Sequence, residues 1–97
     1  MLQWLSASEA QAFGRSLANV FCERVPVGSR MSEKQFAAKT KAVLRTMETQ
    51  IAQYRSSHST NFYQKAQLGN AFKWALRDGG YDTQYVDEIT EWLIVHF

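Results

Sequence analysis

Cysteine, proline, histidine and glycine are all scarce in this 97-residue chain, which contains one Cys, one Pro, two His and five Gly. A single cysteine cannot form an internal disulfide. A zinc site needs three or four ligands, and so few Cys and His residues do not readily supply them. We therefore predict no metal and no cofactor, and expect Cys22 to be a reduced, buried thiol.

Long apolar runs are also lacking. The start of the sequence has no positively charged region before its apolar residues, which stop at Ser6, so a secretory leader is not indicated. The longest apolar run near the end, 92–95, is far below the roughly 20 residues that span a bilayer. Apolar residues make up 45% and charged residues 21%, as in soluble globular proteins. We expect a single domain over 1–97, located in the cytoplasm and not in a membrane.

The few helix-breaking residues concentrate at 25–30 and 79–80, which leaves long segments free to form helices. Ser6 is followed three residues later by Glu9, and Ser32 by Gln35. This spacing is typical of a capping box, in which side chain and backbone satisfy each other's free groups at a helix start. It predicts helices over 7–24 and 33–55, the first closed by Pro26.

The second half of the chain predicts two further helices, over 60–78 and 82–96. Ser59 or Thr60 would cap the first, which would end at Gly79 as a left-handed residue. Asp82 would cap the second. Apolar residues recur at helical spacing in all four segments, and we expect these on the inward faces: Phe13, Leu17, Val20, Phe21, Phe36, Thr40, Val43, Leu44, Met47, Ile51, Tyr54, Leu68, Phe72, Ala75, Leu76, Tyr85, Val86, Ile89, Trp92 and Leu93.

Four amphipathic helices joined by short connections predict an all-α fold, most simply a small four-helix, mostly antiparallel bundle. An irregular orthogonal helical domain or a helix-turn-helix variant is the alternative.

No catalytic constellation stands out. Cys22 could pair with His58 or His96 as a nucleophile, but no neighbour in the sequence activates the thiol. The glycine pair at 79–80 matches neither a phosphate-binding loop nor a dinucleotide fingerprint. The carboxylates of the last helix are typical of a solvated face. We therefore predict that the chain is not an enzyme.

Charge divides unevenly. Residues 1–57 hold eight Lys and Arg against four Glu, a net charge of +4, whereas residues 58–97 hold three against five, a net charge of −2. Arg30, Lys34, Lys41 and Arg45 could follow a nucleic-acid backbone through phosphate contacts. The alternative is that the basic second helix lies beside the acidic fourth one.

The third helix carries a second stripe opposite its core face. Its members are spaced by four, three, four and three residues: Tyr63, Gln67, Asn70, Trp74 and Arg77. If the stripe faces water, its aromatic, amide and Arg side chains suit a binding hot spot. The alternative is burial beneath Trp4 and Leu5 or beneath the segment around Pro26.

The last turn is apolar almost all round. Ile94 and Val95 project to the side of the helix that carries its carboxylates, and Phe97 follows, so these three residues could form a self-association surface. The alternative is an end covered by the segment around Pro26.

These patterns favour a small interaction module, an adaptor or regulator that binds another protein through the third-helix stripe. Self-association would assist this docking. Nucleic-acid binding through the basic second helix, with Trp74 or Tyr63 stacking on bases, is the alternative function.

Overall fold

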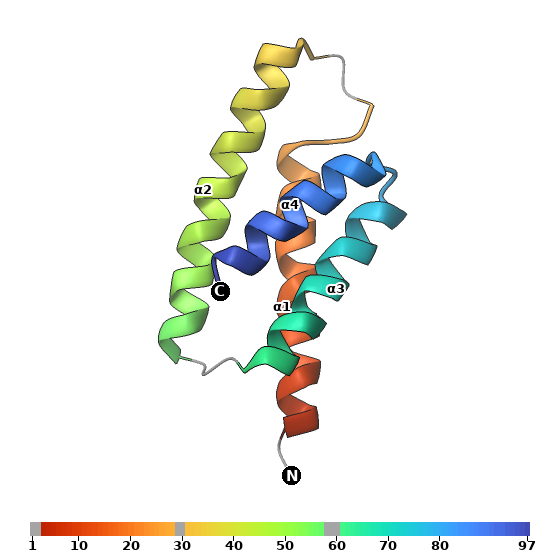
Figure 1. Cartoon of the computed structure of the whole chain (residues 1–97). Coiled ribbons are helices and arrows are strands. Elements are labelled where there is room, and N and C mark those ends of the chain that lie inside the picture. The colour runs from red at the N-terminus through yellow and green to blue at the C-terminus, as the bar shows by residue number, and fades with distance from the viewer. Residues whose placement is uncertain (1–2, 29–30, 58–60) are drawn as a thin grey trace.

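The computed structural model describes residues 3–28, 31–57 and 61–97. It contains four helices, α1 (Gln3–Arg24), α2 (Glu33–Ser57), α3 (Phe62–Asp78) and α4 (Thr83–Val95), and no strand in the described ranges. Consecutive helices run in opposite directions (Figure 1). The predicted all-α four-helix bundle is confirmed.

Two helices, α2 and α4, begin where the capping residues Ser32 and Asp82 predicted that they would. Before α2, the N–H of Gln35 donates to Ser32 Oγ at 3.2 Å, and the N–H of Ser32 donates to Gln35 Oε1 at 3.1 Å. Before α4, Asp82 accepts a hydrogen bond from the N–H of Tyr85 at 3.2 Å. Each bond satisfies a backbone donor that has no partner inside the helix.

Two other predicted starts were wrong. α1 begins at Gln3, so Ser6 lies inside the helix and does not open it. Its start lies earlier because no helix-breaking residue stands between Gln3 and Ser6. α3 is capped by Asn61, which forms a complete capping box with Gln64. The predicted caps Ser59 and Thr60 lie outside the described residues.

The end of α3 also differs from the prediction. Gly79 has φ −73° and remains right-handed, whereas Gly80 takes the left-handed conformation with φ 94°. Helical geometry therefore continues one residue further than expected before the chain reverses. Glycine tolerates that positive φ because it has no Cβ.

The core is centred on α1 and α3, which lie side by side and run in the same direction (Figure 1). Three small, buried residues of α1, Ala10, Gly14 and Ala18, follow one another at intervals of four. A Cβ on Gly14 would overlap the backbone oxygen of Leu68, so the two helices approach as closely as their backbones allow. Among the described residues, the interface between α1 and α3 is more extensive than that of any other pair of helices.

The other two helices each pack against one member of this pair. α4 crosses α3 where Ile94 packs over Gly69, and α2 lies along α1. In the described part of the chain, no Cα of α2 comes within 8 Å of one in α4 or α3. The buried apolar core confirms much of the predicted inward set and adds Ala10, Ala18 and Val25. Its members are Ala10, Leu17, Ala18, Phe21, Val25, Val43, Met47, Ile51, Leu68, Phe72, Leu76, Val86, Ile89 and Leu93.

The bundle is elongated, with principal extents of 48 × 24 × 19 Å. Among the described residues, none of the helices combines the length and apolar character that crossing a membrane requires.

Candidate functional site

The outer face of α3 is open to solvent. Tyr63 and Trp74 are each 57% exposed, and Asn70 between them is exposed as well. The opposite face of the same helix is fully buried at Leu68 and Phe72. The helix therefore separates a packed apolar face from an exposed aromatic one, as the spacing of the stripe predicted.

Two members of the stripe are half-buried and have partners within the molecule. The side-chain amide of Gln11 donates to Gln67 Oε1 at 2.6 Å, which ties the stripe to α1. The Arg77 guanidinium carbon lies 5.1 Å from the centre of the Trp74 ring, within cation–π range. These contacts hold the middle and the end of the stripe in fixed positions.

The segment around Pro26 lies elsewhere. The Tyr81 hydroxyl donates to the backbone oxygen of Val25, and Pro26 lines a cavity of about 270 Å³ with Tyr81 and Tyr85. Burial raises the pKa of Tyr81, and the neighbouring Cys22 thiol raises it further. This segment contacts Tyr81, just before the start of α4, and does not cover Trp74, which stays exposed. The side chains of Trp4 and Leu5 lie outside the described part.

Phe62 extends the exposed surface at the start of α3, since 86% of it is exposed. Phe62 was not among the predicted site residues because it lies about 100° around the helix from Tyr63, off the stripe. Its position directly after the cap Asn61, with no apolar neighbour one turn earlier, is the signal that could have indicated an exposed ring.

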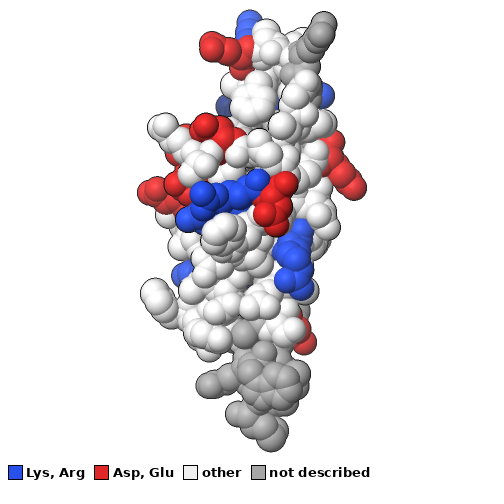
Figure 2. All heavy atoms as spheres, turned by 90° about the vertical axis from the view of Figure 1, so that its right-hand side faces the viewer, with Lys and Arg blue, Asp and Glu red and all other residues white. Residues whose placement is uncertain are grey.

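On this side of the molecule, Lys and Arg side chains lie beside Asp and Glu side chains across the middle and upper parts of the described surface (Figure 2). Lys73 of α3 pairs with Asp87 of α4 at 3.5 Å. This ion pair joins α3 to α4 beside the stripe.

The basic residues lie on a different helix. Lys34, Lys41 and Arg45 are exposed on α2, while Arg30 falls outside the described residues. α2 and α3 lie on either side of α1 in Figure 1. A single strand that followed the α2 cations would therefore leave the α3 aromatics on another part of the surface.

The three residues of the predicted self-association surface differ in environment. Ile94 packs over Gly69 of α3 instead of facing outward with the carboxylates, because the absence of a Cβ on Gly69 leaves room for it. Phe97 packs edge-on against Phe13, with ring centres 6.2 Å apart. Only Val95, 76% exposed, faces solvent. The contacts that cover this end come from α1, α2 and α3.

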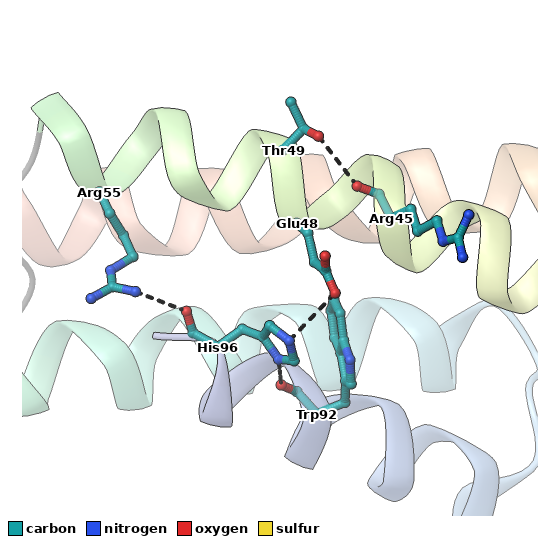
Figure 3. Close-up of polar contacts among 6 residues, drawn as sticks. All are labelled: Arg45, Glu48, Thr49, Arg55, Trp92 and His96. Carbon is teal, nitrogen blue, oxygen red and sulfur yellow. Dashed lines mark hydrogen bonds and ion pairs between the residues drawn. The ribbon is translucent and has the colours of Figure 1, made fainter.

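The end of α4 is fastened to α2 by polar groups around His96 (Figure 3). His96 Nε2 lies 3.5 Å from Glu48 Oε1, and its Nδ1 lies 2.8 Å from the backbone oxygen of Trp92. Arg55 donates to the backbone oxygen of His96 at 3.3 Å. His96 therefore joins the end of α4 to α2.

A Cys–His nucleophile pair is not assembled from Cys22 and His96. Cys22 lies near Tyr81, before the start of α4, whereas His96 follows its end. A helix of 13 residues is about 20 Å long, which separates the two groups. His58 lies outside the described residues, and within the described ranges no three His, Cys, Asp or Glu side chains form a metal-binding group.

Comparison of the chain with protein-family models, curated proteins and solved structures finds no match.

Proposed function

We propose that this chain is a small cytoplasmic interaction module, an adaptor or regulator that binds another protein through the α3 stripe (Tyr63, Gln67, Asn70, Trp74 and Arg77). The observation that carries the proposal is the exposure of Tyr63 and Trp74, at 57% each, on a helix whose other face is fully buried. Exposed aromatic side chains aligned along one rigid helix are typical of a docking surface.

The side chains of the stripe suit a hot spot. Trp, Tyr and Arg are the residues most enriched among those that dominate binding free energy. The Trp74 ring is held beside Arg77, so less rotational freedom is lost when a partner covers it. Asn70, exposed between the aromatics, is free to hydrogen-bond a partner's backbone.

Site-specific photo-crosslinking tests the proposal. A benzophenone amino acid is placed at Asn70 and, as the matched control, at Asn19, an exposed Asn of α1. The Asn70 position should crosslink a discrete partner that the Asn19 position does not, and Trp74→Ala should abolish that crosslink. Equal crosslinking at both positions, or crosslinking that survives Trp74→Ala, would reject the stripe as the docking site.

Nucleic-acid binding through Lys34, Lys41 and Arg45 is the second candidate. The observation that favours it is that these three side chains are exposed, and that neither Lys41 nor Arg45 has an ion-pair partner among the described residues. Such binding would weaken by orders of magnitude between about 50 and 200 mM salt. A gel-shift titration with mixed oligonucleotides that shows no retention at low salt would exclude it.

A further inference from the structure

A shallow apolar groove runs between α2 and α4, away from the α3 stripe. One part, of about 360 Å³, is lined chiefly by apolar and aromatic side chains of both helices. A second hollow, of about 390 Å³, is lined by residues of α4 alone and shares Glu88 with the first. We call their combined lining the α2/α4 groove: Phe36, Ala37, Thr40, Lys41, Leu44, Tyr85, Glu88, Ile89, Glu91, Trp92 and Val95.

The groove exists because α2 and α4 do not pack directly on each other. Their Cα atoms stay more than 8 Å apart throughout the described ranges, and side chains bridge the space. At one end the hydroxyls of Thr40 and Tyr85 lie 2.8 Å apart, and at the other Glu48 meets His96. Between these ties the apolar lining has no helix above it: Leu44 and Trp92 are half-buried, and Val95 is exposed.

The two rims of the groove carry opposite charges. Lys41 lies on the α2 rim, and Glu88 and Glu91 lie on the α4 rim. All three side chains are exposed, and none has an ion-pair partner within 4.0 Å in the described structure. The charges of α2 and α4 therefore face one groove without neutralising each other, which leaves them free to pair with groups of an occupant.

We propose that the α2/α4 groove binds one amphipathic helix of a partner protein, as a docking site separate from the α3 stripe. The α4 side of the groove runs from Tyr85 to Val95, about 15 Å at the helical rise, which matches three turns of an occupant helix. Apolar residues of the occupant, three and four apart, pack on Leu44 and Ile89.

Charge complementarity determines which charged residues flank the apolar seam of the occupant helix. Lys or Arg on one side of its apolar seam faces Glu88 and Glu91, and an Asp or Glu on the other side faces Lys41. A second copy of this chain does not offer such a helix, because α1–α4 each bury their own apolar face within the bundle. A partner helix with a free apolar seam is therefore the occupant that fits.

The experiment is a selection from a random 20-residue peptide library displayed on phage, with the full chain as bait. Peptides that bind are counter-selected on an Ala37→Glu variant, which places a charge on the groove at an exposed helical position. Ala38→Glu is the matched control, since Ala38 is equally an exposed alanine of α2 but does not line the groove. The bound peptide is then located by chemical-shift mapping on the labelled chain.

We expect the selected peptides to carry an apolar seam at helical spacing, flanked by basic residues on one side and an acidic residue on the other. Ala37→Glu should weaken them about tenfold or more, while Ala38→Glu and Trp74→Ala change their affinity by less than about twofold. Shifts should map to Leu44, Ile89 and Trp92. Retained binding to Ala37→Glu, or shifts confined to α3, would overturn the proposal. So would groove shifts that depend on protein concentration alone, since these would indicate a second copy.

Loss of peptide binding in Trp74→Ala would also overturn the proposal that the groove binds the peptide, because it would place the peptide on the α3 stripe. The stripe itself is tested by its own crosslink, so the two sites can fail independently. If both hold, the chain bridges two partners through two surfaces.

Discussion

The hydroxyls of Thr40 and Tyr85 lie 2.8 Å apart and join α2 to α4 at one end of the open groove. Because the two backbones do not pack directly, such side-chain ties hold α4 against α2. Thr40→Val keeps the shape of the side chain and removes the bond, leaving a half-buried Tyr85 hydroxyl without this partner. We expect the free energy of unfolding to fall by about 1 kcal/mol, measured by urea denaturation.

Thr49→Val is the control for that substitution. Thr49 is another threonine of α2, exposed, and its hydroxyl bonds only the backbone of its own helix, at 3.3 Å from the oxygen of Arg45. We expect a change within about 0.5 kcal/mol. Equal losses in the two variants would show that the bond to Tyr85 does not contribute to the attachment of α2.

The close contact of α1 with α3 predicts an unusual effect at Gly14. Alanine favours a helix by about 1 kcal/mol over glycine. A Cβ on Gly14 would nevertheless overlap the backbone oxygen of Leu68, and a backbone atom cannot rotate away. We expect Gly14→Ala to lower the free energy of unfolding by about 1–3 kcal/mol. Ser16→Ala, at an exposed position one half-turn away, should be neutral or slightly stabilising. Stabilisation by Gly14→Ala would contradict the described contact.

Two half-buried tyrosines, Tyr81 and Tyr85, predict a loss of stability in alkali. Burial raises the pKa of Tyr81 and of Tyr85 above the usual tyrosine value of about 10, and the hydrogen bond from Thr40 partly lowers that of Tyr85. Since the pKa is higher in the folded state, the stabilisation is complete below about pH 10 and is lost as the pH rises past it. We expect the urea midpoint to stay level up to about pH 10 and to fall as the pH rises above it.

Tyr81→Phe isolates that contribution. It removes the ionisable hydroxyl, so the midpoint should start lower, because the bond to Val25 is lost, and then fall less steeply with pH than in the unmodified chain. Parallel pH profiles for the two proteins would mean that Tyr81 does not contribute to the alkaline transition.

Helical spacing and local chemistry were enough to predict the elements and much of the core. Val43, Met47 and Ile51 lie buried on one face of α2 because burial on a helix follows its period. The Ser32 cap formed because its partner stands three residues away, within one turn. The Ser6 box failed because a cap also requires the preceding chain to leave the helix, which Gln3 to Leu5 do not do.

Which helices pack together depended on small residues, and the spacing of apolar residues does not show which small residues form a contact. Ala10, Gly14 and Ala18 bring α1 and α3 together in parallel, a pattern visible in the sequence as three small residues at intervals of four. The orientation of Ile94 depends on the space over Gly69, on another helix, which local spacing does not reveal.

The stripe was predicted by spacing, but its exposure depended on tertiary structure. Whether Trp74 faces solvent depends on which elements cover α3, and the segment around Pro26 lies against Tyr81 instead. The α2/α4 groove was not predicted at all, since it arises from a distance between two helices.

The docking role of the α3 stripe is tested most directly by the affinity of Trp74→Ala for the partner crosslinked at Asn70. Trp74 is 57% exposed, so its truncation should leave the urea midpoint nearly unchanged. We expect Trp74→Ala to lose about 2 kcal/mol of binding free energy, roughly 30-fold in Kd. Unchanged affinity, or a variant that no longer folds, would contradict it.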